Sequence, residues 1–524
     1  MFIDDKILIG KNDEKELFIL PSMANRHGLI TGASGSGKTI TVKVMAESFS
    51  SAGVPVFVSD IKGDLSGTCL PGEMTEKIAG RLTNINIDPN SFATKGFPVV
   101  FWDVFGKDGH PIRATVESIG VTIMSRMLGL SEAQEGVLAI AFKVSKDKNM
   151  RLVDLKDLRV LLQYIGDNRQ DFTMSYGNVA PQTVGSIQRS ILALQEQGGD
   201  VFFGEPALDI NDFLRVNANG FGNVNILECV ELFKQPKLYS CFMLWLLTAL
   251  NNTLPEVGDL PKPKIVFFFD EAHLLFDDMP KYMLTNVIQV VKLIRSKGIG
   301  LYFISQTPKD IPDEILAQLG NRTQHTLRAY TPADQKIVKA VASSFRVNPN
   351  FDTEEAIMGL GTGEAVISYS NEKGEPNIVE KATILPPQSM MGAIDDSTRL
   401  MVMSRSEFRG KYEVAVDNET AYEKITAEVT AKKEEEEARK AEEEKAKLEA
   451  QKAKEEAKLE AQKAKEELQK AKLEAQKAKA EEQKKKATAK KKSRLDKAID
   501  SAATSAARSL GTKVVNKVFK NLFK

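Results

Sequence analysis

The sequence predicts an α/β fold with a mainly parallel sheet, followed by a long helix rich in Ala, Glu and Lys. Two observations predict the sheet. Over residues 1–410, short β-branched or aromatic runs alternate with helical stretches, and several of these runs are apolar at nearly every position. A third observation predicts the helix, because residues 431–492 are almost entirely Ala, Glu, Lys and Gln. The overall composition, 42% hydrophobic and 27% charged, is that of a globular protein.

Eight segments are expected to form the core strands. Each is rich in Val, Ile, Phe or Tyr, as strands buried on both faces are. They are residues 27–31, 54–60, 97–103, 223–230, 264–270, 299–305, 323–328 and 364–370. Between residues 105 and 220, helical periodicity dominates, for instance over 114–128 and 132–144, so this part is predicted to be a largely helical insertion.

A complete phosphate-binding motif follows the first of these strands. Residues 31–39 read TGASGSGKT and match the pattern GxxxxGK[ST], and an amphipathic helix is expected over residues 40–49. Glycines let backbone N–H groups point at phosphate oxygens, while the lysine reaches the β- and γ-phosphates and the threonine hydroxyl binds Mg²⁺. The predicted nucleotide-binding residues are Gly32, Ala33, Ser34, Gly35, Ser36, Gly37, Lys38 and Thr39. The motif therefore predicts an ATP and Mg²⁺ site of the P-loop NTPase type.

A second motif completes this site at the end of the strand over 264–270. Five apolar residues precede Asp270, which is expected to bind Mg²⁺, and Glu271, which is expected to orient and deprotonate the attacking water. A P-loop kinase transfers phosphate to a substrate hydroxyl and does not need the second acid. The pair therefore favours ATP hydrolysis over a role in capping the next helix.

Three further positions have less specific patterns. Gln306 follows a buried strand, and it is expected to sense the γ-phosphate or position the water. The alternative is that it is an ordinary polar residue in the loop that leaves the strand. Arg328 is the candidate arginine finger for a neighbouring subunit, with Arg295 and Arg322 as competitors and a surface salt bridge as the alternative. The acids of residues 60–64 either face the nucleotide or the substrate channel, or belong to a turn with solvated carboxylates.

The C-terminal region is predicted to be helical and highly charged. An 11-residue repeat, KLEAQKAKEE followed by Ala or Leu, occupies residues 447–468, and its apolar seam is mostly alanine. Both a lone charge-stabilised helix and a self-associating coiled coil are compatible with this pattern. Residues 493–524 are expected to form a basic amphipathic helix that docks onto this protein or a copy of it, or contacts a membrane surface or nucleic acid.

Bulk properties narrow the class of protein. The net charge is zero, but residues 484–524 contain thirteen Lys and Arg against two Asp, so the rest of the chain is acidic. The three cysteines have no CxxC spacing, which fits a reducing compartment and argues against a zinc site. With no signal peptide and no apolar run near the roughly 20 residues of a membrane span, a cytoplasmic protein without a transmembrane segment is expected.

Four strings of the sequence closely resemble the bacterial HerA-like P-loop ATPases of the YjgR type, in the HerA/FtsK superfamily. They are ANRHGLITGASGSGKT, VPVFVSDIKGDLSG, KIVFFFDEAHLLF and GLYFISQTPKDIP, and the likeness covers most of residues 1–415. The resemblance implies an additional-strand P-loop core, a homo-oligomer that is often a hexameric ring, and ATP turnover coupled to translocation of double-stranded DNA.

The resemblance also assigns residues by position. Lys38, Thr39, Asp270, Glu271 and Gln306 match the Walker A, Walker B and sensor-like residues. The position of Arg328 best matches the arginine finger. One departure is that HerA proper has an N-terminal β-barrel before its ATPase core, whereas here the motif begins after 31 residues. That barrel and the nuclease contacts it makes are therefore not expected here.

Together these features predict five segments and three competing functions. The segments are residues 1–104 (first part of the ATPase core, with Walker A), 105–220 (helical insertion), 221–415 (second part of the core, with Walker B), 416–492 (charged helix or coiled coil) and 493–524 (basic amphipathic helix). The favoured function is a ring ATPase that moves DNA or remodels a nucleoprotein complex. The alternatives are an ATP-driven protein assembly switch whose tail recruits a protein partner, and an oligomeric scaffold with structural ATP.

Overall fold

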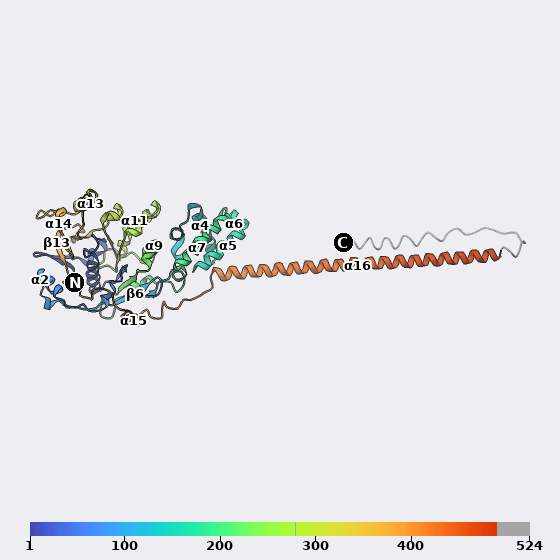
Figure 1. The fold of residues 1–524 in the computed structure, drawn as a ribbon, viewed down its shortest axis with the longest axis horizontal. Coiled ribbons are helices and arrows are strands. Elements are labelled where there is room, and N and C mark those ends of the chain that lie inside the picture. Colours follow the sequence, from blue (N-terminus) through green and yellow to red (C-terminus); the bar gives the residue numbers. More distant parts are fainter. Residues whose placement is uncertain (278, 490–524) are drawn as a thin grey trace. The chain divides into compact units, whose positions relative to one another are not determined.

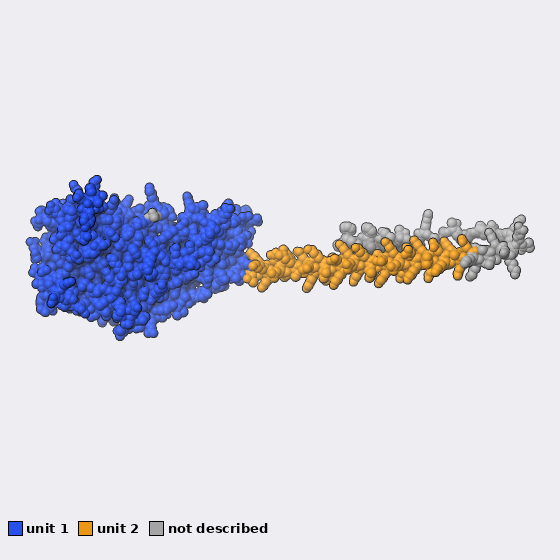
Figure 2. Space-filling view, in the orientation of Figure 1, with its two compact units in different colours: residues 1–429 blue, residues 430–524 orange. Residues whose placement is uncertain are grey.

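The computed structural model describes residues 1–489 except residue 278, with side chains described up to residue 483. The chain forms two compact units, divided after Val429 (Figures 1 and 2). The basic amphipathic helix predicted over residues 493–524 lies outside the described residues. The other predicted segment boundaries, at residues 104, 220 and 415, stay predictions.

The core of the first unit is a sheet whose central strands are all parallel to their neighbours. In spatial order these are β11 (Asn321–Gln324), β4 (Gly28–Thr31), β10 (Ile299–Ser305), β9 (Ile265–Phe269), β5 (Val56–Asp60), β8 (Val224–Glu228) and β6 (Val99–Asp103). Apart from one position in β11, every residue of these strands is buried. The prediction of a mainly parallel sheet covered on both faces is confirmed.

Antiparallel strands extend the sheet beyond β11. They are β12 (Glu364–Ser368), β13 (Glu380–Ile384), β2 (Lys6–Lys11), β1 (Phe2–Ile3) and β3 (Glu16–Ile19), and β7 (His110–Pro111) lies at the opposite edge. Of these, only β12 was among the predicted strands. The strand expected over residues 323–328 was placed too late, because β11 ends at Gln324 and leaves Arg328 in the loop that follows.

Side chains that alternate along the strands divide into two core clusters. Ile30, Val58 and Phe268 pack with apolar residues of α1 (Lys38–Ser51), whereas Leu29 and Phe267 face the cluster that includes α9 (Pro236–Thr253). Further helices line the second cluster: α3 (Val116–Leu128), α10 (His273–Phe276) and α11 (Lys281–Ile294). The prediction that the helix after the P-loop is amphipathic was wrong, because residues 41–50 are all buried.

The part between β7 and β8 is mainly helical. After α3 it contains α4 (Glu132–Asp147), α5 (Leu155–Asp167), α6 (Arg169–Tyr176), α7 (Pro181–Leu194) and the short α8 (Asp200–Phe202). Apolar residues of α3, α4, α5 and α7 join the same core cluster as α9. The insertion therefore continues the hydrophobic core of the sheet on that face. Other short helices flank the sheet: α2 (Glu76–Asn84), α12 (Asp313–Leu316), α13 (Pro332–Ser343) and α14 (Thr353–Gly359).

A segment that we call the strap, residues 385–421, follows β13 and contains α15 (Asp396–Ser404). Polar contacts fasten it along its length to side chains of earlier elements. These contacts join Ser389 to Glu47, Arg399 to Glu228, Ser406 to His110, Tyr412 to Asp212 and Thr420 to Asp157. The start of the strap contributes to the burial of α1, because Lys43 donates to the carbonyl of Met390 and Glu47 accepts from the N–H groups of Gln388 and Ser389.

The helix α16 (Ala421–Ala489) begins in the first unit and supplies all the described residues of the second. Every described side chain from residue 432 onward is exposed, and the ion pair between Lys440 and Glu436, 2.8 Å apart, has the i,i+4 spacing that stabilises a helix. A lone helix and a coiled coil both remain compatible with this exposure. None of the helices in the described part of the chain is long and apolar enough to cross a bilayer.

Candidate active site

The ends of three adjacent parallel strands bring the predicted site residues to one edge of the sheet. In the register of the sheet, Thr31 of β4 pairs with Ser305 of β10, and β10 pairs in turn with β9. The residues that follow these strands are therefore neighbours: the P-loop after β4, Gln306 after β10 and Asp270 after β9. Ligands of parallel α/β sheets bind beyond this edge.

The P-loop needs glycine at positions where other residues do not fit. The φ of Gly32 is +152° and that of Gly37 is +115°, in the region that disfavours L side chains. A Cβ at Gly32 would lie 2.5 Å from the Cβ of His325, and one at Gly37 would lie 3.1 Å from Gly363. The backbone thus turns tightly against its neighbours, while Ser34 at the tip stays exposed.

Lys38 already lies against the loop that it is predicted to serve. Its Nζ donates hydrogen bonds to the carbonyl of Gly32 at 2.6 Å and of Ala33 at 3.2 Å. Burial lowers the pKa of Lys38, while the nearby carboxylates of Glu271 and Asp270 act in the opposite direction. Its ammonium group therefore has the charge and the position to meet phosphate oxygens.

The donors of the loop fit a triphosphate. Within the described part of the chain, the N–H groups of Ser34, Gly35 and Gly37 donate to no acceptor, and the buried hydroxyl of Ser36 has no partner. Such inward-facing donors at the start of a helix are the usual cradle for phosphate. Thr39 and Asp270 supply a hydroxyl and a carboxylate, the hard oxygen ligands that Mg²⁺ prefers.

His325 supports the loop from below, a role that the sequence did not predict. Its Nδ1 lies 2.9 Å from the carbonyl of Glu364 and its Nε2 lies 2.9 Å from the hydroxyl of Thr41 on α1. Because a carbonyl only accepts, Nδ1 carries the proton and Nε2 accepts from Thr41. Burial lowers the pKa of His325 to about 4, so the ring is neutral.

The neutral state of His325 leads to a prediction about stability. Since its pKa is near 6.5 in the unfolded chain and about 4 in the folded one, the unfolded state gains the proton first, and stability is lost as the pH falls below 6.5. Between pH 7 and pH 5, the free energy of unfolding of the wild type is expected to fall by about 2 kcal/mol because of His325. The variant His325→Gln should not show this part of the loss. Urea unfolding of both proteins at the two pH values measures this difference. Equal losses would contradict the assignment.

Asp270 and Glu271 follow β9 in a closely held turn. The N–H of Glu271 donates to Oδ1 of Asp270 at 2.9 Å, and Glu271 has a φ of +46°, unusual for a residue other than glycine. Burial, then the charge of Glu271, raises the pKa of Asp270 to about 6. His273 at the start of α10 places Nδ1 3.3 Å from Oε2 of Glu271, although the two atoms do not form an aligned hydrogen bond. The two carboxylates are therefore close enough at the strand end for the charge of Glu271 to raise the pKa of Asp270.

Gln306 and the three candidate arginine fingers differ in whether their side chains are already bound to other groups. Gln306 and Arg328 are both exposed, and Arg328 forms no ion pair with the residues that the structure describes. Among its competitors, Arg322 donates to the carbonyls of Leu316 and Leu319 at 3.0 Å each, and Arg295 pairs with Asp259 at 3.2 Å. The roles of Gln306 and Arg328 stay predictions.

Asp60 belongs to a turn, but its carboxylate is not solvated. Each of its oxygens accepts a backbone N–H at 2.8 Å, one from Gly63 and one from Leu65, and the side chain is buried. Burial, then the charge of Glu228, raises the pKa of Asp60 to about 7. Its contacts identify it as a residue that shapes the turn after β5.

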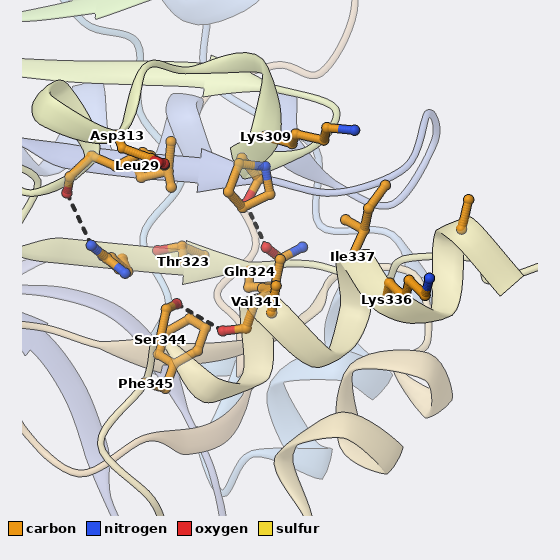
Figure 3. A pocket seen from close by; sticks show the side chains of 16 residues that line it. Leu29, Lys309, Asp313, Thr323, Gln324, Lys336, Ile337, Val341, Ser344 and Phe345 are labelled. Carbon is orange, nitrogen blue, oxygen red and sulfur yellow. Dashed lines mark hydrogen bonds between the residues drawn. The ribbon is translucent and has the colours of Figure 1, made fainter.

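A groove of about 480 Å³ lies beside the β4–β11 pair, separate from the P-loop (Figure 3). Its floor includes Leu29, Thr323 and Gln324, and residues of α12 and α13 form its walls. The hydroxyl of Thr31 donates to Oε1 of Gln324 at 2.6 Å across this floor. No residue of the phosphate-binding motif after Thr31 lines the groove, so it is not the phosphate cradle.

A Ser–His–Glu arrangement around a buried histidine also appears, which was not found in the sequence. His110 places Nδ1 2.8 Å from Glu413 and Nε2 2.8 Å from the hydroxyl of Ser406. The imidazole is 1% exposed and packs against the rings of Trp102 and Phe408. Because Ser406 and Glu413 both belong to the strap, these contacts fasten the strap to β7.

The chain matches one protein-family model and is similar to several known proteins. The family model described as helicase HerA-like C-terminal matches residues 5–524. The DNA double-strand break repair helicase HerA of Sulfolobus acidocaldarius is 22% identical over 400 residues, which are 74% of this chain and 70% of the relative. The protein of the same name from Sulfurisphaera tokodaii is 23% identical over 379 residues, 70% of this chain and 67% of the relative. Among solved structures, VirB4 of Thermoanaerobacter pseudethanolicus is similar with a TM-score of 0.48 and 14% identity, over 74% of this chain and 97% of that one.

Proposed function

The chain belongs to the helicase HerA-like C-terminal family, as its sequence predicted, and from this premise we propose that it is an ATPase that moves double-stranded DNA. The observation that carries the hydrolytic part is the juxtaposition of the P-loop, Gln306 and Asp270 at the ends of three adjacent parallel strands. The DNA part is supported by the family, whose curated members of similar sequence include DNA repair helicases.

The residues at the sheet edge have distinct roles in this proposal. Lys38 and the loop N–H groups bind the β- and γ-phosphates and stabilise the negative charge that develops on them. Thr39 and Asp270 would hold Mg²⁺, which supplies charge neutralisation when bound. Glu271 accepts the proton of the attacking water as the P–O bond to the γ-phosphate breaks, and Gln306 positions that water.

We propose that the working form is a homo-oligomer, with a hexamer as the favoured assembly. Arg328 is an exposed guanidinium without an ion pair in the part of the chain described, which suits a group that completes a neighbouring subunit's site. The long exposed α16 favours a second candidate function, in which the tail recruits a protein partner and ATP drives assembly in place of DNA movement.

A titration with duplex DNA tests the proposed function. Steady-state ATP turnover is measured across DNA lengths and at two salt concentrations, because phosphate contacts are weakened by salt. Turnover is expected to rise with DNA and to rise less at high salt. If DNA of every length leaves turnover unchanged, the DNA function is wrong and the protein-assembly function is favoured instead.

A mixing experiment tests the role of Arg328. Arg328→Ala and Lys38→Ala are each expected to lose turnover, by about 10³-fold or more for a true arginine finger. When the two inactive proteins are mixed and allowed to exchange subunits, some sites combine an intact P-loop with an intact neighbouring arginine, so turnover should return. Arg295→Ala is the matched control and should remain active alone. A mixture that stays inactive, although subunits exchange, would remove Arg328 from this role.

A further inference from the structure

The backbone N–H and carbonyl of Asp270, the residue before Glu271, are each held by a buried hydroxyl group from outside the motif. Ser59 is the fourth residue of β5, next to β9 in the sheet, and its Oγ accepts the N–H of Asp270 at 3.0 Å. Tyr239 lies in the first turn of α9, and its hydroxyl donates to the carbonyl of Asp270 at 2.8 Å. Both side chains are 0% exposed, so water cannot replace either contact.

The two hydroxyl groups also lie next to each other. The oxygen atoms of Tyr239 and Ser59 are 3.3 Å apart. Burial raises the pKa of Tyr239 well above its usual range, so its hydroxyl keeps the proton that the carbonyl of Asp270 accepts. On the other side of the turn, the N–H of Ala272 donates to the carbonyl of Ile304 in β10 at 2.9 Å. The turn after β9 is therefore fastened to both flanking strands and to a helix.

This fastening bears directly on the direction of Glu271. The carbonyl of Asp270 and the N–H of Glu271 belong to the same planar peptide. Because φ of Glu271 is measured from the carbonyl carbon of Asp270, fixing that carbonyl fixes one end of this dihedral. That φ is +46°, a left-handed value that a glutamate avoids without outside support. If the peptide rotated, Glu271 would relax toward a right-handed φ and its carboxylate would point elsewhere.

We propose that Tyr239 and Ser59 are positioning residues for hydrolysis, which hold the carbonyl and the N–H of Asp270 so that Glu271 is aimed at the attacking water. The proposal rests on the assignment of Glu271 as the base. In the described part of the chain, neither hydroxyl is hydrogen-bonded to the phosphate-binding loop, and neither residue belongs to a nucleotide-binding motif. Their contribution should therefore appear in the chemical step and not in the binding of nucleotide.

The test removes single oxygen atoms from buried side chains. Tyr239→Phe is expected to lower kcat by about ten- to a hundredfold, since a small displacement of a reacting group has effects of this size. The Kd for a fluorescent ATP analogue should stay within about twofold of wild type. Ser59→Ala should act in the same way, and the double variant should lose little more than either alone, because both hydroxyls hold the backbone of one residue, Asp270.

Tyr369→Phe is the matched control. It removes an equally buried tyrosine hydroxyl, which lies 2.9 Å from the Thr323 hydroxyl and far along the chain from the Asp270 turn. It is expected to leave kcat unchanged, and thermal melting of all variants shows whether each is folded. The proposal is overturned if Tyr239→Phe retains wild-type kcat, or if its kcat loss is matched by an equal loss of nucleotide affinity.

A further variant separates this proposal from the function on which it rests. If Glu271→Gln keeps wild-type turnover, the assignment of the base fails and the positioning role fails with it. If Glu271→Gln loses turnover while Tyr239→Phe and Ser59→Ala do not, the base stands and only the positioning role is wrong.

Discussion

Replacing Lys38 by Ala is expected to lower ATP turnover by roughly 10²- to 10³-fold, the usual effect of removing one group that stabilises transition-state charge. The physical reason is the position of its Nζ, which lies within hydrogen-bond distance of the loop carbonyls of Gly32 and Ala33. Nucleotide affinity should fall as well, because the same charge binds the phosphates before the reaction. Steady-state turnover and equilibrium binding of an ATP analogue measure the two effects.

The control for this variant is a lysine with a similar side chain in another place. Lys336 on α13 is exposed and lies at the separate groove beside β11, so Lys336→Ala should keep wild-type turnover. Thermal melting should show little change for Lys38→Ala, since its hydrogen bonds in the described structure reach only carbonyls of its own loop. Full activity in Lys38→Ala would mean that hydrolysis takes place at another site.

Glu271→Gln is expected to lower turnover by roughly 10²- to 10⁴-fold, the range for loss of a general base, while ATP still binds. Glutamine has the shape of glutamate but takes no proton from water at neutral pH. It meets the same backbone strain at a φ of +46°, so the turn should keep its form. Single-turnover kinetics should show bound ATP that persists, and DNA binding should be spared.

Glu256→Gln is the matched control for this second variant, because Glu256 is exposed in a loop outside the sheet edge. If Glu271→Gln hydrolyses ATP normally, another group must activate the water. His273 would then be the first residue to substitute, since its Nδ1 is 3.3 Å from the same carboxylate. If Glu271→Gln fails to bind ATP, the loss reflects binding and does not identify a base.

The central sheet was predictable because each of its strands has a local sequence pattern that is typical of buried strands. β9 and β10 are unbroken apolar runs that only a position between two helical layers explains. The edge strands were missed for the opposite reason. β2 and β13 are as long as the central strands but include lysines, and their pairing of Gly10 with Ile384 depends on residues far apart in sequence, which no local pattern reveals.

The same distinction holds at the site. Lys38, Asp270 and Glu271 lie in motifs whose spacing carries the chemistry, so their arrangement at the sheet edge follows from the sequence. His325 and Tyr239 belong to no motif, and each meets its partner only when distant elements are brought together. Arg328 illustrates a third case: its residue type was informative, but its expected strand ended four residues earlier.

The strap gives the molecule a path along which mechanical load can travel. One of its ends is bonded to Glu47 on the helix that begins at the P-loop, and the other is bonded to Asp157 just before α16 starts. The first turn of α16 is anchored at the same place, because the N–H of Ala421 donates to the carbonyl of Arg151 and that of Tyr422 donates to Asp157. A pull on this turn therefore meets these bonds first, and the lateral bonds of the strap are the next link toward α1. The attachment of α16 and the position of the phosphate-binding helix are thus connected through one continuous segment.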